Sequence, residues 1–188
     1  GKIHAITCTG ANLEEDVFNL VAHSKYQKIP NRRTLSEQEE AELYEQGFNR
    51  VTDTCIPEGE AIRHIEDKII KQWKSKSAFP HEHLMAILDD LEPEIPITDS
   101  WLIAARDAGI PVYVPGWEDS TLGNIFAAHC IKGDVDRSAV KIGVDYMIHL
   151  AEWYKSAEHP IGFLQIGGGI AGDFPICVVP MILSLIHI

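Results

Sequence analysis

With 188 residues, of which 45% are hydrophobic and 23% charged, the chain has the composition of one globular domain with a substantial core. Its formal net charge of −12 argues against nucleic acid or an anionic membrane as its main partner, and no apolar run predicts a membrane span or a signal peptide. The four cysteines lie far apart without a Cys-x-x-Cys pair, which favours reduced thiols and a cytoplasmic location.

The first half of the chain predicts one strand followed by helices. Ser36 and Glu39 have the spacing of a capping box, which predicts the start of a charged helix. Hydrophobic periodicity predicts the other helices. The expected elements are a strand at residues 3–7, a turn at 8–12, and helices at 14–23, 36–46, 58–76 and 81–91.

The second half alternates strands and helices, which predicts an α/β fold with a parallel sheet covered by helices on both faces. In order, we expect a helix from Asp99 or Ser100 to 108, a strand at 111–115, a loop at 116–120, helices at 121–131 and 138–157, and a strand at 161–166. Ligands bind beyond the carboxyl ends of such strands. The loops at 8–12, 116–120 and 167–172 are therefore expected to line a site.

Three consecutive glycines end the apolar run 161–166, and a helix is expected from about residue 171. Gly167, Gly169 and Gly172 match G-x-G-x-x-G at a predicted strand-to-helix turn, which is typical of a dinucleotide phosphate site. Glycines let the backbone approach a pyrophosphate, and a helix N-terminus offers unpaired N–H groups. The acidic residue that would hold the ribose, about 20 residues further on, falls beyond the sequence.

The acidic and histidine residues allow several interpretations. Glu14 and Glu15 cannot both face one ligand, because successive helical side chains diverge by about 100°; one of them could cap the helix. Asp119 either caps the helix that follows it or faces a ligand. His81 and His83 lack the H-E-x-x-H spacing, so no metal site is predicted.

The ends of the sequence suggest an internal piece of a longer protein. It lacks an initiator Met, and the expected strand begins almost at once. We expect residues 1–182 to be a partial domain. The apolar residues 183–188 fit no element, and one back-translation of them is the end of a transposon-based sequencing adaptor. We therefore interpret them as a non-native tail, with a natural hydrophobic terminus as the alternative.

Six motifs occur in the order expected for the deoxyhypusine synthase family, which the sequence resembles over about residues 1–182. They are Thr9-Gly-Ala-Asn-Leu-Glu-Glu-Asp16, Gly47-Phe-Asn-Arg50, Pro57, Pro111-Val-x-x-Pro115, Asp119-Ser-Thr-Leu-Gly123 and Gly167-Gly-Gly169. The run from the glycines through Ile-Ala-Gly-Asp-Phe-Pro-Ile-Cys-Val-Val-Pro resembles in particular the bacterial deoxyhypusine synthase-like branch.

The resemblance implies a Rossmann-like domain in a homotetramer, with NAD and amine sites between paired subunits. Its chemistry is NAD-dependent transfer of an aminobutyl group from spermidine to an acceptor amine, a protein lysine in the family's type reaction. A homospermidine synthase-like enzyme that uses putrescine is one alternative. A non-catalytic NAD- or polyamine-binding subunit is another.

The motif matches also imply roles for individual residues. The positions that resemble NAD-contacting residues are Thr9, Gly10, Ala11, Glu15, Asp119, Gly167, Gly168 and Gly169. Glu15 also lies near the amine, and Asn124 and Asp173 stand where the family has an amine-binding aspartate and histidine. The family's catalytic lysine lies in a Trp-Gly-Lys segment that this sequence lacks, and Lys132, Lys141 and Lys155 do not match it. We therefore expect these 188 residues to be inactive in lysine-dependent transfer.

Overall fold

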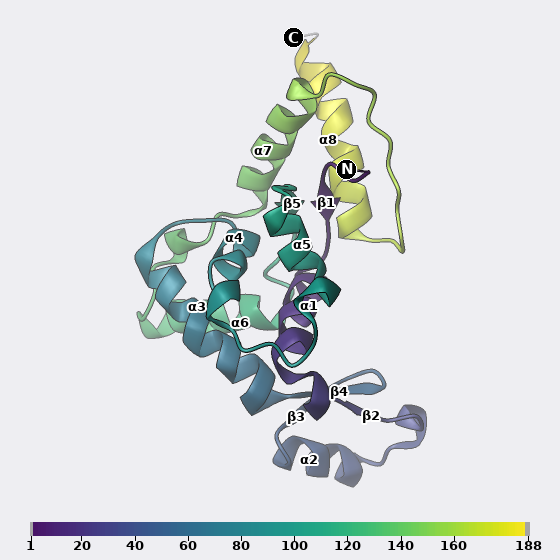
Figure 1. The fold of residues 1–188 in the computed structure, drawn as a ribbon, viewed down its shortest axis with the longest axis vertical. Helices are drawn as coiled ribbons and strands as arrows, with labels where there is room; N and C mark the ends of the chain where they lie inside the picture. Colours follow the sequence, from purple (N-terminus) through teal and green to yellow (C-terminus); the bar gives the residue numbers. More distant parts are fainter. Residues whose placement is uncertain (1, 187–188) are drawn as a thin grey trace.

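The computed structural model describes residues 2–186 and is elongated, with a two-stranded parallel sheet in its upper half and an antiparallel sheet near its lower end (Figure 1). The strands are β1 (Ile6–Thr7), β2 (Gln27–Lys28), β3 (Phe48–Val51), β4 (Thr54–Pro57) and β5 (Val112–Tyr113). The α-helices are α1 (Gly10–Ala22), α2 (Glu37–Glu45), α3 (His64–Ser75), α4 (Pro80–Met85), α5 (Trp101–Asp107), α6 (Thr121–Lys132), α7 (Gly143–Ser156) and α8 (Ile170–Ile186). A π-helical segment, Glu58–Arg63, leads into α3, and short 3-10 helices cover His23–Lys25, Arg32–Thr34, Leu88–Asp90, Ile97–Asp99 and Arg137–Ala139.

The parallel sheet joins two segments that are far apart in the sequence. Ile6 pairs with Val112 and Thr7 with Tyr113. The Cys8 N–H extends the ladder by donating to the Tyr113 carbonyl at 2.9 Å. The strands expected at 3–7 and 111–115 are therefore present, although shorter than predicted. The structure is a mixed α/β fold with a small parallel sheet.

The strand predicted at residues 161–166 does not form within the part of the chain that the structure describes. These residues are extended but lie outside any sheet, and their side chains face solvent: Leu164 is 90% exposed and Ile166 is 91% exposed. Figure 1 shows this segment running along one side of the molecule, away from β1 and β5. An apolar run favours burial, but a strand also needs a neighbouring strand to bond its backbone. The hydrophobicity of residues 161–166 does not show whether a neighbouring strand is present.

The antiparallel sheet, with strand order β2-β4-β3, was not predicted. Its hairpin joins β3 and β4 through Thr52, whose φ of 58° is left-handed, followed by Asp53. A turn with this geometry usually carries glycine or asparagine. The Thr52-Asp53 pair therefore gives no recognisable hairpin signal.

The helix predicted over residues 138–157 begins later, at Gly143. Residues 139–141 bond across to another segment instead: the Ala78 N–H donates to the Ala139 carbonyl and the Lys141 N–H donates to the Ala78 carbonyl. These bonds use the backbone groups that a helix would need. The helix predicted over 81–91 is also shorter than expected: it ends at Met85, and a separate 3-10 helix covers Leu88–Asp90.

The hydrophobic core surrounds α1. Leu13, Val17, Phe18 and Leu20 are fully buried, and α1 packs against α5, α6 and the π-helical segment. This central position matters because the first turn of α1 lies at the end of β1, where a ligand site was predicted.

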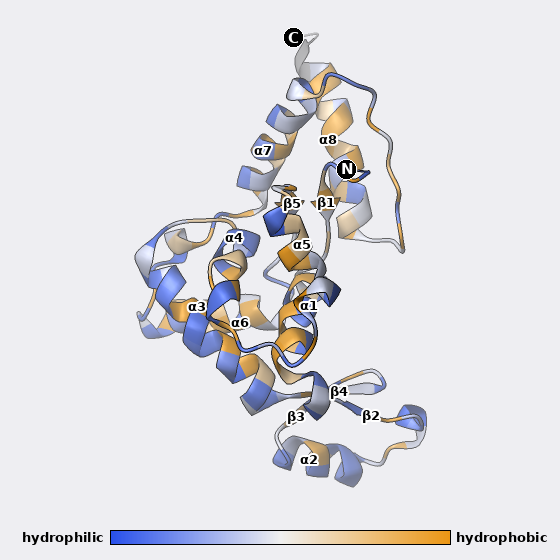
Figure 2. Cartoon of the chain, viewed as in Figure 1, coloured by the Kyte–Doolittle hydropathy of each residue, from blue (hydrophilic) through white to orange (hydrophobic). Residues whose placement is uncertain are grey.

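Helix α8 is hydrophobic along most of its length, whereas α2 is largely hydrophilic (Figure 2). Residues 183–186 continue α8, and residues 187–188 lie outside the described residues. The proposed non-native origin of residues 183–188 stays a prediction.

Candidate functional site

Three loops meet where β1 and β5 end. A Cβ built on Gly10 would lie 2.7 Å from the Ser120 Cβ and 3.1 Å from the Trp117 carbonyl oxygen, so the start of α1 rests directly on the 116–120 loop. A Cβ built on Gly116 would lie 3.0 Å from the Ile170 Cδ1 at the start of α8. The 116–120 loop therefore contacts the N-terminal ends of both α1 and α8. This confirms that the three loops chosen from the sequence lie together.

Glu14 caps another helix rather than its own. Its side chain is buried, at 4% exposure, and its two carboxylate oxygens accept hydrogen bonds from the N–H groups of Thr121 at 2.9 Å and Leu122 at 2.8 Å. Burial raises the pKa of Glu14, and the two backbone hydrogen bonds oppose that shift. Glu14 therefore joins α1 to the first turn of α6.

Asp16 makes the same kind of cap on α5. Its carboxylate accepts from the Ser100 hydroxyl at 2.6 Å and from the N–H groups of Trp101 and Leu102 at 3.2 and 3.3 Å. Two of the three consecutive acids of α1 are thus used in holding neighbouring helices. The sequence did not reveal these caps, because donor and acceptor are more than 80 positions apart.

Glu15 points in a different direction from its two neighbours, as the helical geometry predicted. It is half-buried, and its Oε2 accepts a hydrogen bond from the Tyr26 hydroxyl at 3.1 Å. Burial raises the pKa of Glu15; the Tyr26 hydrogen bond lowers it, and the nearby Glu14 charge raises it further. A partly desolvated carboxylate with no cationic partner in residues 2–186 is a suitable acceptor for an amine.

The N-termini of α1 and α6 differ in which backbone N–H groups they leave without a hydrogen-bond partner. At α1, the Thr9 hydroxyl accepts from the Asn12 N–H at 3.2 Å, and Gly10 and Ala11 at the start of the helix have no intrahelical partner for their N–H groups. At α6, Glu14 and the Ser120 hydroxyl bond the first three N–H groups. An anion would therefore find free donors at α1 and not at α6.

Asp119 is not the cap of α6. Ser120 occupies that position, and its Oγ accepts from the Gly123 N–H at 3.0 Å. The Asp119 side chain is exposed beside the site. Asn124 is exposed one turn further along, with its Nδ2 donating to the Ser120 carbonyl at 2.7 Å. Of the two interpretations of Asp119, the capping one is wrong.

The three glycines form an open turn before α8. Gly167 and Gly169 have φ values of 86° and 79°, which favour glycine, and a Cβ built on either of them or on Gly168 would meet nothing within 4 Å. Asp173 is exposed in the first turn of α8, and its N–H donates to the Gly169 carbonyl at 3.0 Å. The predicted turn into a helix is present, whereas the strand before it is not.

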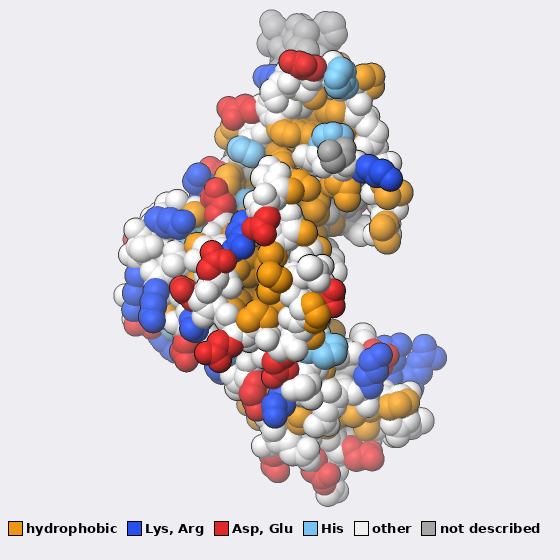
Figure 3. All heavy atoms as spheres, in the orientation of Figure 1, with side chains coloured by type: hydrophobic (Ala, Val, Ile, Leu, Met, Phe, Trp, Pro, Cys, Tyr) orange, Lys and Arg blue, Asp and Glu red, His pale blue; other side chains and the backbone are white. Residues whose placement is uncertain are grey.

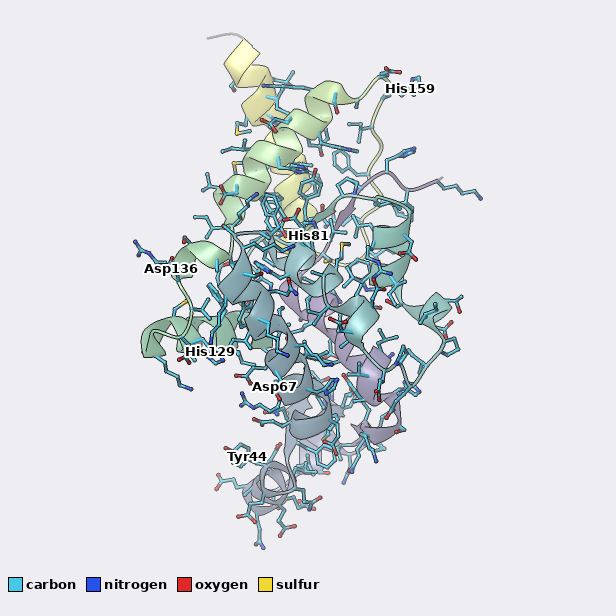
Figure 4. All side chains as sticks on the ribbon, turned by 60° about the vertical axis from the view of Figure 1, so that its left-hand side comes forward. Tyr44, Asp67, His81, His129, Asp136 and His159 are labelled. Atoms are coloured by element: carbon cyan, nitrogen blue, oxygen red, sulfur yellow. The ribbon has the colours of Figure 1, made fainter. Side chains whose placement is uncertain are left out.

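His81 and His83 make separate contacts within the fold. His81 Nδ1 lies 2.7 Å from the Tyr146 hydroxyl, and His83 Nε2 donates to the buried Ala139 carbonyl at 2.9 Å. Figure 4 shows His81, His129 and His159 in different parts of the molecule. Within residues 2–186, no group of three or more His, Cys, Asp or Glu side chains is placed to hold a metal ion. None of the described helices has the length and apolar character needed to cross a bilayer.

Comparison with known proteins gives one consistent result. The family model described as DS: Deoxyhypusine synthase matches residues 1–184. The chain is 26% identical over 180 residues to a protein named "Probable deoxyhypusine synthase" from Aeropyrum pernix, covering 91% of this chain and 53% of that protein. It is 25% identical over 178 residues to a "Deoxyhypusine synthase-like protein" from Elusimicrobium minutum, covering 92% of this chain and 45% of that protein. The chain therefore spans about half the length of these curated relatives.

Proposed function

Because this chain belongs to the deoxyhypusine synthase family, a family of transferases, we propose that it serves an NAD-dependent transfer of an aminobutyl group from spermidine to an acceptor amine. The convergence of three loops at the ends of β1 and β5 is the observation that supports this proposal most directly. The same proposal includes a larger Rossmann-like sheet and a homotetramer with its sites between paired subunits.

The residues at the site fit a dinucleotide. The turn formed by Gly167, Gly168 and Gly169 has open space where side chains would otherwise stand, so its backbone is accessible to a flat or anionic group. The first turn of α1 offers the N–H group of the exposed Ala11 to a pyrophosphate. The exposed Asp119 carboxylate, on the loop between these two elements, is available to accept from a ribose hydroxyl.

A polyamine fits the remaining groups of the site. Glu15 supplies a half-buried carboxylate for one ammonium group, and Asp173 supplies an exposed one at the start of α8. A charge-assisted hydrogen bond to a partly desolvated carboxylate is stronger than one to an exposed group. NAD, when bound, would accept the hydride that leaves the carbon beside the secondary amine of spermidine. The residues of this chain would hold the amine and the cofactor.

The acceptor remains a choice between a protein lysine and putrescine. Asn124 is neutral where the family has an amine-binding aspartate, and Asp173 is acidic where the family has a histidine. One carboxylate is thus replaced and another added nearby. This rearrangement favours a cationic ligand that is held differently from the family's type substrate. A free diamine acceptor such as putrescine would be such a ligand.

The cofactor assignment is tested by Gly168→Ala. A methyl group at Gly168 meets open space, and this residue has no left-handed backbone, so the fold should be unaffected. If the cofactor lies against the backbone there, the methyl group should weaken NAD binding about tenfold or more. Gly162→Ala is the matched control, because it also points into open space and lies in the same exposed segment.

Binding is measured by titrating NAD against the intrinsic tryptophan fluorescence of the wild type and both variants. Equal affinities for Gly168→Ala and Gly162→Ala would remove the glycine turn from the proposed site. A wild type that shows no saturable binding of NAD would contradict the proposed function itself.

A further inference from the structure

We propose that Glu14 is a positioning residue, which sets the place of Asp119 in the cofactor site by holding the loop between β5 and α6. The inference rests on the proposed function, since it concerns the same site. Glu14 touches no part of the site that a ligand could reach, because its side chain is 4% exposed and its oxygens face the first turn of α6.

Glu14 joins α1 by hydrogen bonds to the residues that directly follow this loop. Its oxygens accept from the consecutive N–H groups of Thr121 at 2.9 Å and Leu122 at 2.8 Å. A buried carboxylate that accepts two backbone N–H groups fixes both the distance and the direction of the peptide units that it bonds. Asp119 lies two positions before the first of these peptides, so its backbone is held close to this anchor.

Close packing against the same helix also holds the loop. Gly10 lies against Ser120 without room for a Cβ, and a Cβ built on Gly123 would lie 2.5 Å from the Trp117 carbonyl oxygen and 2.8 Å from the Glu118 Cα. The loop is therefore folded back on the first turn of α6 and pressed against the start of α1. The Asp119 N–H completes the turn by donating to the Gly116 carbonyl at 2.9 Å. Since the loop is held against α1 by this packing and by the Glu14 hydrogen bonds, a change at Glu14 should move the Asp119 carboxylate.

Asp16 provides a control that the chain itself supplies. It lies two residues further along α1 and also accepts two consecutive backbone N–H groups, those of Trp101 and Leu102, at the first turn of α5. Loss of either cap removes hydrogen bonds to a helix N-terminus, so both variants should lose stability. Only the cap made by Glu14 leads to the 116–120 loop.

The experiment compares Glu14→Gln with Asp16→Asn in the 188-residue chain. The amide of Gln places a donor where Glu14 accepts, so one of its two bonds is lost. We expect NAD affinity to fall about tenfold or more for Glu14→Gln and to stay within about twofold of wild type for Asp16→Asn. Binding is measured below the unfolding midpoint of each variant. Equal losses in the two variants, or wild-type affinity in Glu14→Gln, would overturn the inference.

A double-mutant cycle with Asp119→Asn separates positioning from general destabilisation. If Glu14 acts through Asp119, Glu14→Gln should weaken NAD binding far less when Asp119 has already been replaced. Additive losses would contradict the inference. Glu14→Asp, which keeps the charge but is one methylene shorter, replaces Glu14→Gln in the cycle if the Gln variant does not fold.

A separate measurement distinguishes failure of this inference from failure of the proposed function. If the wild type binds no NAD, the proposed function fails, but amide hydrogen exchange still reports on the loop. Exchange at residues 119–122 should then be faster in Glu14→Gln than in Asp16→Asn. Equal exchange in both variants would show that Glu14 does not hold the loop.

Discussion

At the scale of single residues, three consecutive acids of α1 have three different environments. Glu14 and Asp16 accept backbone N–H groups from α6 and α5, whereas Glu15 is bonded only by the Tyr26 hydroxyl among the described residues. Their chemistry is nearly identical, so position on the helix decides which of them is available to a ligand. The available one is Glu15, which is also the residue that the sequence comparison with the family had singled out.

The raised pKa of Glu15 predicts how Glu15→Gln changes stability with pH. A carboxyl group whose pKa is raised by folding contributes stability that is complete below its unfolded pKa, near 4.5, and is lost as the pH rises through the folded pKa. Gln stays neutral and can still accept from Tyr26. The variant should therefore match the wild type at pH 4 and be the more stable protein at pH 7.

Urea unfolding at pH 4 and pH 7 measures this difference, with Glu60→Gln at an exposed position as the control. A Glu15→Gln variant that is less stable than the wild type at pH 7 would contradict the raised pKa of Glu15.

The same substitution, Glu15→Gln, should weaken spermidine binding roughly 10- to 100-fold, since a hydrogen bond to a charged group contributes about 1.5–3 kcal/mol.

At the scale of elements, the close approach of α1 to the 116–120 loop predicts the effect of Gly10→Ala. The new methyl group would lie 2.7 Å from the Ser120 Cβ, so the loop must shift. Overpacking of this kind costs about 1–3 kcal/mol. Thermal unfolding should show a lower midpoint for Gly10→Ala.

Gly143→Ala is the matched comparison, because Gly143 also begins a helix but has open space around its Cβ position. Its midpoint should be unchanged or higher, since alanine favours a helix by up to about 1 kcal/mol. Equal destabilisation by the two substitutions would argue against the close packing at Gly10.

Much of the element order could be predicted from the sequence. The capping box of Ser36 and Glu39 is present as the local pattern predicted, because its donors and acceptors lie within four residues. Of the two candidates Asp99 and Ser100, Ser100 is the cap of α5. The hairpin around Thr52 and the break before Gly143 could not be predicted in this way. The hairpin depends on the left-handed backbone of Thr52, an unusual turn residue. The break before Gly143 depends on long-range hydrogen bonds to Ala78.

The candidate site was predicted in part. The three loops could be predicted because ligands of parallel α/β folds bind beyond the carboxyl ends of the strands. The caps made by Glu14 and Asp16 could not, because no local pattern links a helix to N–H groups more than 80 residues away. Ser120 was overlooked in favour of Asp119, since both are favoured capping residues and the sequence does not choose between neighbours.

At the scale of the whole molecule, hydrophobic side chains are exposed on the upper part of the structure (Figure 3). The segment before α8 contributes Phe163, Leu164 and Ile166, which are 48%, 90% and 91% exposed. Exposed apolar side chains gathered in one segment promote association. The lower end, around α2, presents mainly charged groups instead.

The double substitution Leu164→Lys and Ile166→Lys should reduce self-association of the chain. We expect a lower weight-average mass in concentration-dependent light scattering than for the wild type. Ile131→Lys is the control, because Ile131 is 87% exposed but stands on α6, away from this segment. An equal reduction by the control would show that added charge, and not loss of this apolar segment, is responsible.

The long-range caps of α1 also set the order in which the chain can fold during its synthesis. The partners of Glu14 lie 107 and 108 positions later, and β5, the partner of β1, is about as distant. At about 5–20 residues per second, the ribosome needs roughly 5–20 s to make them after Glu14 is added. During that time the π-helical segment can already pack against α1, but the part of α1 that contacts α6 stays uncovered and the candidate site cannot form. Contacts of such high sequence separation slow folding. The region with the clearest local signature is therefore among the last to be assembled.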